Sequence, residues 1–125
     1  MSLVERFPTL SVVVPTYNRE QMLCQTLEAL ARRLEPQVEL IVVDQTQKHE
    51  AQTEAFLSAL AQQGVIRYFR LQRPSLPNAR NFGARQARGE VVLFVDDDIL
   101  PGERLFAAHL AEYADAGVGG VAAMV

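Results

Sequence analysis

Short runs of β-branched and aliphatic residues constrain this chain more than any other feature. Five apolar residues in succession at 91–95 precede three aspartates, and similar runs stand at 10–14, ending at Pro15, and at 38–43. A strand buried on both faces carries such a run, because both of its sides meet apolar groups. We therefore predict three buried strands. A further run at 65–71 alternates apolar residues with arginines, which predicts a half-solvated strand at a sheet edge.

Helical patterns fill the intervals between these strands. Helices are expected at 19–34, 51–63, 76–88 and 102–114, and a last strand is expected at 118–125. Asn18 and Ser75 are the expected N-caps of the first and third helices. Strands that alternate with helices predict an α/β fold with a mainly parallel sheet flanked by helices. Right-handed crossovers favour the strand order 3-2-1-4.

The composition is that of a folded, slightly acidic chain, with 125 residues, 49% of them hydrophobic, and a net charge of −3. This length predicts one domain, 1–125, around one core. The scattered Lys and Arg residues argue against nucleic acid as a partner, because phosphate backbones are bound by clustered cations. No apolar run approaches the ~20 residues of a membrane span, and no signal-peptide pattern opens the chain. With Cys24 as its single cysteine, the chain is expected to be cytoplasmic and free of internal disulfides.

Three consecutive carboxylates, Asp96, Asp97 and Asp98, follow the run at 91–95. Three like charges at one strand end are unfavourable unless a cation collects them, and Mg²⁺ or Mn²⁺ with oxygen ligands suits them. The alternative is a polar loop in which Asp98 helps to cap the following helix. Tyr17, Asp44 and the triplet all follow carboxyl ends of expected strands, where open α/β sheets bind their ligands. We therefore predict one binding crevice formed by three loops.

Four motifs, in this order and spacing, resemble family 2 glycosyltransferases. They are Val-Val-Val-Pro-Thr-Tyr-Asn-Arg at 12–19, Ile-Val-Val-Asp at 41–44, Leu-Pro-Asn-Ala-Arg-Asn-Phe-Gly at 76–83 and Val-Leu-Phe-Val-Asp-Asp-Asp at 92–98. The resemblance covers about 10–125 and implies the Rossmann-like type A glycosyltransferase fold of nucleotide-diphospho-sugar transferases. It also implies an inverting transfer of a sugar from a nucleotide-sugar donor to an acceptor that the sequence does not identify, with Mn²⁺ or Mg²⁺ as cofactor.

The resemblance implies which residues bind the nucleotide. Pro15, Thr16 and Tyr17 would line the pocket, with Tyr17 against the base. Asp44 would accept a hydrogen bond from the imide N–H of a pyrimidine, which favours a uridine or thymidine diphosphate donor. Arg80 would reach toward the nucleotide. The structural alternatives are a turn proline, a partly buried tyrosine, an Asx turn at Asp44 and a solvated arginine.

The resemblance also divides the acidic triplet into separate roles. Asp96 would face the ribose and, with Asp98, would serve the metal that bridges the two phosphates of the donor. Asp97 would point elsewhere. A divalent cation stabilises the diphosphate leaving group as negative charge develops on it.

Two departures from the family pattern bear on these roles. Many relatives carry a second aspartate and a Gly-Ser or Gly-Thr turn after the residue matching Asp44, whereas this chain has Gln-Thr-Gln-Lys at 45–48. Relatives are also about twice as long, and their second half supplies the acceptor pocket and the catalytic base. The chain is therefore expected to be the nucleotide-binding half of such an enzyme, with no base of its own. Neither His49 nor His109 is assigned as a metal ligand.

Three further hypotheses remain open from the sequence. A non-catalytic sugar-nucleotide-binding module would share every motif and lack only the base. A receiver-type signalling domain also has clustered aspartates, but its acidic cluster should follow the first strand and a lysine should follow a late one. The uncharged strand at 118–125 predicts pairing with a second copy in a homodimer, with docking on its own sheet as the alternative.

Overall fold

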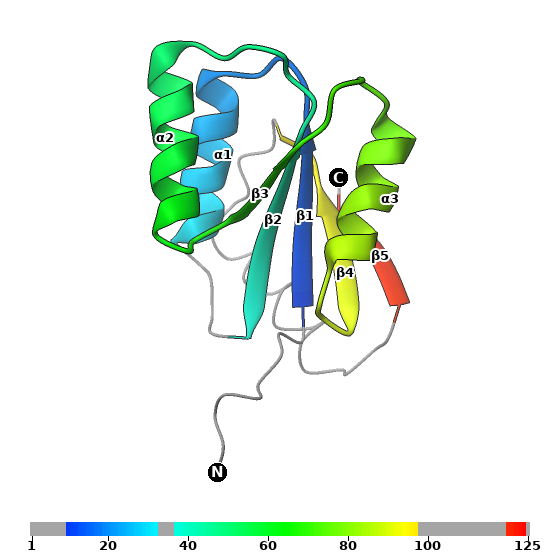
Figure 1. Ribbon diagram of the computed structural model, residues 1–125. Coiled ribbons are helices and arrows are strands. Elements are labelled where there is room, and N and C mark those ends of the chain that lie inside the picture. Colours follow the sequence, from blue (N-terminus) through cyan, green and yellow to red (C-terminus); the bar gives the residue numbers. More distant parts are fainter. Residues whose placement is uncertain (1–9, 33–36, 98–119, 125) are drawn as a thin grey trace.

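The computed structural model describes residues 10–32, 37–97 and 120–124, the last of these by backbone alone, and shows one parallel sheet between two helical layers (Figure 1). The strands are β1 (Leu10–Thr16), β2 (Val38–Asp44), β3 (Arg67–Arg70), β4 (Val91–Val95) and β5 (Gly120–Met124). The helices are α1 (Gln21–Ala31), α2 (Ala51–Gln62) and α3 (Leu76–Gln86). The order β3-β2-β1-β4-β5, with every neighbouring pair parallel, confirms the predicted arrangement. The helix expected at 102–114 lies outside the described residues.

Each face of the sheet has its own apolar layer. Helices α1 and α2 cover one face, where Leu23, Leu27 and Leu30 of α1 and Leu57 of α2 are fully buried. Helix α3 covers the other face, where Ala79 packs with the alternate side chains of β1 and β2. This is the layering that a 3.6-residue apolar stripe on each helix and continuous apolar strands dictate. Strand β3 is only half-buried, as its alternating pattern predicts for an edge.

Strand β1 runs two residues further than expected. We predicted that Pro15 would end it, but Pro15 pairs with Val43 and the strand continues to Thr16. A proline lacks the N–H that a central strand normally donates. Here the described pairing of β1 with β4 ends at Val13, so the missing N–H of Pro15 removes no hydrogen bond between these two strands. The extension makes Thr16 the last residue of β1, at the carboxyl edge of the sheet.

The turn after β1 also differs from the prediction. Asn18 is not the N-cap of α1; Glu20 holds that position without a side-chain cap hydrogen bond. Asn18 instead has a φ of 56°, in the left-handed region that asparagine tolerates better than most residues. Its N–H donates to Oγ1 of Thr46 at 2.7 Å, so a contact with the loop after β2 fixes this turn.

The start of α3 is set as predicted, and its approach to the sheet is close. The hydroxyl of Ser75 accepts the N–H of Asn78 at 3.4 Å, with Pro77 in the first turn. A Cβ at Gly83 would overlap Cγ1 of Val13 and lie 3.3 Å from Cγ2 of Val43. Glycine therefore lets α3 lie directly on β1 and β2, which places its N-terminus beside the carboxyl end of β1.

A polar cluster joins the strands at their amino ends. Oε2 of Glu39 accepts the Ser11 hydroxyl at 2.5 Å and the N–H of Arg88 at 2.6 Å, while Oε1 pairs with Nη1 of Arg67 at 3.1 Å. Oγ of Ser11 also accepts the N–H of Gly89 at 2.8 Å. One carboxylate thus links β1, β2, β3 and the turn before β4.

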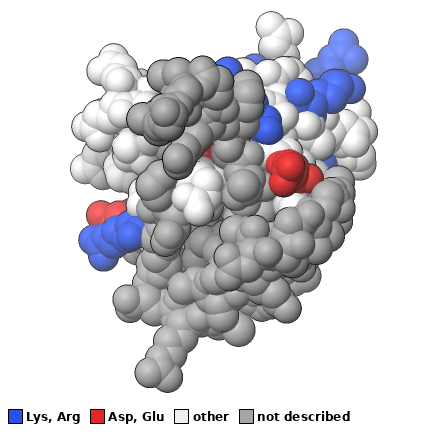
Figure 2. Space-filling model, turned by 90° about the horizontal axis from the view of Figure 1, so that it is seen from below, with Lys and Arg blue, Asp and Glu red and all other residues white. Residues whose placement is uncertain are grey.

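Figure 2 views this lower side and shows the described Lys and Arg side chains in separate groups around its margin. Within the described parts of the chain, no helix is long and apolar enough to cross a membrane. Strand β5 lies at the edge of the described sheet, next to β4. The predicted homodimer through this segment stays a prediction.

Candidate functional site

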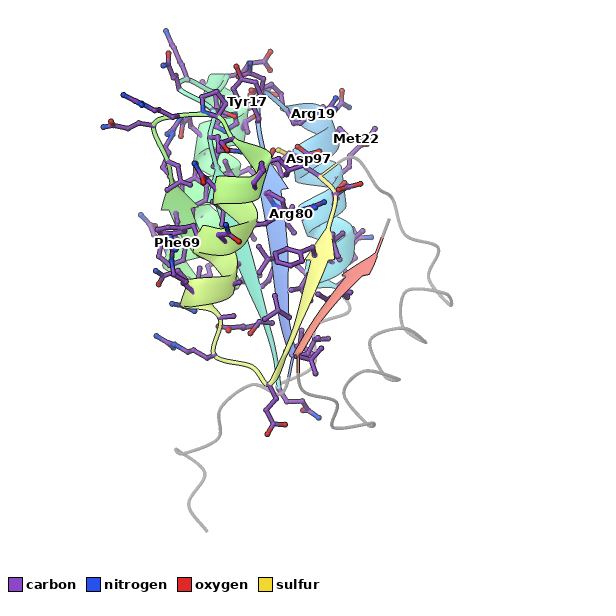
Figure 3. The ribbon with its side chains drawn as sticks, turned by 90° about the vertical axis from the view of Figure 1, so that its right-hand side faces the viewer. Tyr17, Arg19, Met22, Phe69, Arg80 and Asp97 are labelled. Atoms are coloured by element: carbon purple, nitrogen blue, oxygen red, sulfur yellow. The ribbon has the colours of Figure 1, made fainter. Side chains whose placement is uncertain are left out.

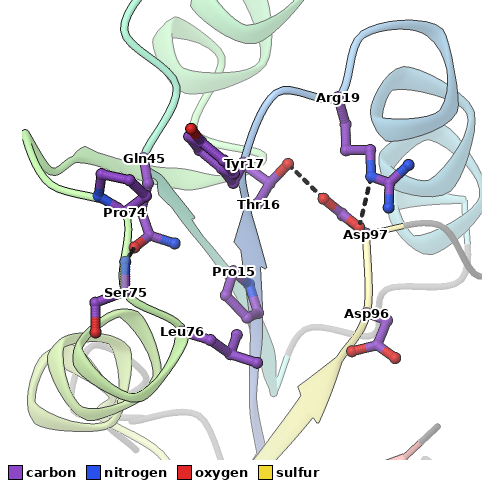
Figure 4. Close-up of a pocket in the computed structure, with 10 residues that line it drawn as sticks. All are labelled: Pro15, Thr16, Tyr17, Arg19, Gln45, Pro74, Ser75, Leu76, Asp96 and Asp97. Carbon is purple, nitrogen blue, oxygen red and sulfur yellow. Dashed lines mark hydrogen bonds and ion pairs between the residues drawn. The ribbon is translucent and has the colours of Figure 1, made fainter.

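A pocket of about 480 Å³ opens at the carboxyl ends of the strands, between β1, β4 and the start of α3 (Figure 4). Its lining comes from the segments that follow four different strands: Pro15, Thr16, Tyr17, Arg19, Gln45, Pro74, Ser75, Leu76, Asp96 and Asp97. This is the switch point where β1 is flanked by β2 on one side and β4 on the other. The predicted convergence of loops is therefore present, with the segment after β3 as an additional wall.

The acidic side of the pocket is formed by Asp96 and Asp97. Oδ2 of Asp97 accepts the hydroxyl of Thr16 at 2.7 Å, and Nε of Arg19 lies 3.6 Å from Oδ1 (Figure 4). We expected Asp97 to point away, and this expectation was wrong for the structure described. The turn after Val95 directs Asp97 toward β1, where the extended strand presents Thr16. Asp98 lies outside the described residues.

Apolar surface lines the opposite part of the pocket. The side chains of Tyr17 and Leu76 are 47% and 49% exposed, although both are large hydrophobic groups. Both residues line the pocket, and so does Pro15 of β1, which is buried. Such flat apolar groups can hold the faces of a planar ring. Pro15, Thr16 and Tyr17 all line this pocket, and their contact with a nucleotide stays a prediction.

Gln45 contributes a fixed polar group to the same pocket. Its main-chain N–H donates to the carbonyl oxygen of Thr16 at 2.9 Å, and its side-chain oxygen accepts the N–H of Ser75. The residue is only 3% exposed. Gln45 therefore joins the ends of β1 and β2 to the first turn of α3. In the sequence, Gln45 was notable only as a departure from the family pattern.

Asp44 lies behind the pocket rather than on its wall. The residue is fully buried, and Oδ1 accepts the N–H of Thr46 at 2.9 Å. Oδ2 is 2.5 Å from Nε2 of His49 and also accepts the hydroxyl of Tyr68. The expected contact with a base is a prediction that would require this carboxylate to leave some of these partners.

His49 is the residue that sequence reasoning missed. It was not assigned a role from the sequence, but in the structure Nδ1 lies 2.8 Å from Oε2 of Glu20 and Nε2 faces Asp44, so the imidazole bridges two carboxylates. Burial lowers the pKa of His49, but its hydrogen bonds to Asp44 and Glu20 outweigh burial and raise it above 6.5 overall. For Glu20, burial raises the pKa, but hydrogen bonds from the N–H of Glu50 and from His49 and Thr53 lower it overall.

Tyr68 belongs to the same buried cluster, and its pKa is also shifted. Burial, followed by its hydrogen bond to Asp44, moves its pKa well above the usual range, so the phenol stays protonated as a donor. The only sequence feature that could have pointed to this cluster is a histidine five residues after Asp44. The position of Glu20, 29 residues before His49, carries no local sequence signal.

Arg80 is the predicted nucleotide contact that the structure does not bring to the pocket. Its guanidinium lies over the ring of Phe94, 5.7 Å from the ring centre, on the side of α3 that faces β4 (Figure 3). It is exposed and does not line the pocket. The predicted contact with a nucleotide stays a prediction.

The pocket has carboxylates, but they do not form a complete metal site among the described residues. Among residues 10–32 and 37–97, no group of three or more His, Cys, Asp or Glu side chains is arranged to hold a metal ion. The pocket nevertheless presents the carboxylates of Asp96 and Asp97, which are hard oxygen ligands of the kind that Mg²⁺ and Mn²⁺ prefer. One or two protein carboxylates suffice where substrate phosphates complete the coordination.

The fold is that of nucleotide-sugar transferases of type A. The family model "Glycosyl transferase family 2" matches residues 11–125, and the chain belongs to this family. This membership excludes the receiver-type signalling domain. The sequence is 36% identical over 89 residues to an uncharacterized glycosyltransferase of Haemophilus influenzae, covering 71% of this chain and 29% of that protein.

Other relatives are named for a specific activity or bound ligand. Poly(ribitol-phosphate) beta-N-acetylglucosaminyltransferase TarS of Staphylococcus aureus is 35% identical over 92 residues, which cover 70% of this chain and 16% of that protein. The structure of TarS 1-349 in complex with UDP-GlcNAc superposes with a TM-score of 0.65 at 30% identity, covering 82% of this chain and 30% of that chain. The structure of GalNAc-T7 with UDP, GalNAc and Mn²⁺ superposes with a TM-score of 0.61 at 26% sequence identity. The match covers 75% of this chain and 19% of that chain.

Proposed function

We propose that the pocket binds the nucleoside diphosphate of a nucleotide-sugar donor together with a divalent metal ion, as part of an inverting glycosyltransferase. The observation that carries the proposal is the pocket itself, with apolar Tyr17 and Leu76 on one part of its wall and Asp96 and Asp97 on another. A nucleotide base needs an apolar surface, and a metal-bound diphosphate needs carboxylates. Both must lie close enough for one nucleotide to reach them. The relatives that bind UDP-GlcNAc, or UDP with Mn²⁺, support the same assignment.

The chain's own residues would bind and orient the donor. The ring of Tyr17 would lie against the base, Asp96 would accept from the ribose, and Asp96 with Asp98 would hold the metal. Arg19 would keep the charge of Asp97 balanced beside them. The metal, when bound, would neutralise the charge that develops on the diphosphate as the sugar leaves. The acceptor and the sugar are not assigned.

This chain spans less than a third of the length of the first curated relatives that it matches. The transferase activity of the whole protein is therefore part of the proposal, and no catalytic base is assigned within the motifs described. If the protein instead only binds sugar nucleotides, UDP binding will persist while neither sugar transfer nor donor hydrolysis occurs. Incubation with UDP-GlcNAc and detection of released UDP separates these two functions.

Calorimetric titration with UDP tests the binding proposal directly. We expect affinity in Mn²⁺ to exceed that in EDTA by about tenfold or more, because Asp96 and Asp98 would hold a metal that neutralises the charge of the diphosphate. Asp98→Ala should remove this difference. Glu90→Ala is a matched control, because Glu90 is an exposed acid just before the opposite end of β4. Equal affinity of the unaltered protein in Mn²⁺ and in EDTA would refute the metal-dependent site.

A further inference from the structure

We propose that Gln45 selects the base of the donor, its side-chain amide donating a hydrogen bond to the 4-keto oxygen of uracil or thymine. The inference rests on the proposed nucleotide binding and goes beyond it by naming the residue that discriminates between bases of equal size. It concerns the position where this chain departs from the Asp-Gly-Ser pattern of many relatives.

The orientation of the Gln45 amide is determined by its neighbours. Its Oε1 accepts the main-chain N–H of Ser75, and the reverse orientation would set the amide NH₂ against another donor. The nitrogen is therefore turned away from Ser75 and toward the interior of the pocket (Figure 4). The backbone of Gln45 is held in addition by its hydrogen bond to Thr16. The group is fixed before any ligand arrives.

The amide nitrogen is a donor that lacks a described partner. Gln45 is 97% buried and is one of the residues that line the pocket. Within residues 10–32 and 37–97, the side chain makes one hydrogen bond, in which its oxygen accepts the N–H of Ser75. A buried donor without an acceptor is unfavourable, so an oxygen from a ligand would remove that penalty. The pocket lining thus offers the Gln45 amide as a hydrogen-bond donor to a ligand.

The neighbouring Asp44 does not present an acceptor at this point. Its two carboxylate oxygens face inward to Thr46, His49 and Tyr68. Of the two adjacent residues, Gln45 is the one that lines the pocket. The polarity available to the base is therefore that of an N–H donor rather than that of a carboxylate.

The far edge of the base is the part that would reach Gln45. Asp96 and Asp97 lie across the pocket from Gln45 (Figure 4), so a diphosphate and ribose on the acidic side direct the base toward the amide. In uracil and thymine the 4-keto oxygen lies on the edge opposite the ribose. Cytosine carries an amino group there, which is a donor and would meet the donor of Gln45.

Calorimetry with UDP and cytidine diphosphate (CDP) in Mn²⁺ tests this selection. We expect the unaltered protein to bind UDP roughly tenfold more tightly than CDP. Gln45→Glu keeps the side-chain length and an oxygen for Ser75, but it replaces the donor by an acceptor, so the preference should reverse toward CDP. Gln47→Glu is the control for added charge, since Gln47 is exposed and does not line this pocket.

A second measurement needs no variant. The unaltered protein should bind 4-thiouridine diphosphate several-fold more weakly than UDP, because sulfur accepts hydrogen bonds poorly. Equal binding of UDP and CDP by the unaltered protein, or an unchanged preference in Gln45→Glu, would overturn the role of Gln45 and leave the proposed function standing. Absence of any UDP binding by the unaltered protein would overturn the proposed function and this inference with it.

Discussion

Replacing His49 should reveal how much the buried bridge stabilises the fold. The side chain is fully buried between Asp44 and Glu20, so His49→Ala leaves Asp44 without one of its donors. Breaking a buried ion pair typically costs about 3–5 kcal/mol, because the remaining charge stays out of water. Asp44 keeps Thr46 and Tyr68, which places the expected loss at the lower end, about 3 kcal/mol. Glu20 is partly exposed and adds little.

The pH dependence separates this electrostatic role from simple packing. Since the folded-state pKa of His49 is raised above 6.5, its stabilising contribution is complete below that value and is lost as pH rises through the folded pKa. The free energy of unfolding of the unaltered protein should therefore fall across the mildly alkaline range. His49→Ala should not show this fall. The pKa of Glu20 is lowered, so its contribution is lost only in acid, below 4.5.

Urea denaturation followed by circular dichroism, repeated from mildly acidic to mildly alkaline pH, measures both effects. Lys48→Ala is the matched control: Lys48 is the exposed neighbour of His49, and its loss should change stability by less than about 0.5 kcal/mol. A loss for His49→Ala below about 1 kcal/mol, or an alkaline fall of equal slope in both proteins, would refute the charged bridge.

Two further substitutions test the packing that shapes the pocket. Gly83→Ala should lower the free energy of unfolding by about 1–3 kcal/mol, because the new methyl group overlaps Val13; a gain of about 1 kcal/mol, as helix propensity alone predicts, would mean that α3 lies further from the sheet. Thr16→Val should cost about 1 kcal/mol in the same denaturation assay, since Asp97 loses the hydroxyl donor at 2.7 Å; unchanged stability would show that this hydrogen bond contributes nothing.

The architecture could be predicted because it depends on local pattern and on chirality. Leu23, Leu27 and Leu30 are spaced for one helical face, and all three are buried against the sheet. Ser75 carries a cap signal that depends only on the next three residues. The strand order follows from alternation and right-handed crossovers, whatever the loops contain.

The polar contacts of the site could not be predicted, because they join segments that are distant in sequence. Thr16 and Asp97 are 81 residues apart, and Glu20 and His49 are 29 apart. Three adjacent aspartates also give no sign of which one faces the pocket, since this depends on a single turn after β4. The burial of Asp44 shows the same limit: the position was predicted to follow β2, but its partners were not.

The position of Glu39, at the end of the sheet opposite the pocket, affects how such a domain can change during evolution. Glu39 aligns β1, β2 and β3 at the end of the sheet away from the pocket, through Ser11, Arg67 and the N–H of Arg88. None of the residues in this cluster lines the pocket, so these contacts align the strands without the pocket-lining residues. If Gln45 selects the base as proposed, loops at the opposite end can exchange such residues and change the donor preference while the strands keep their register. Specificity and foldability would then vary as separate traits within one lineage.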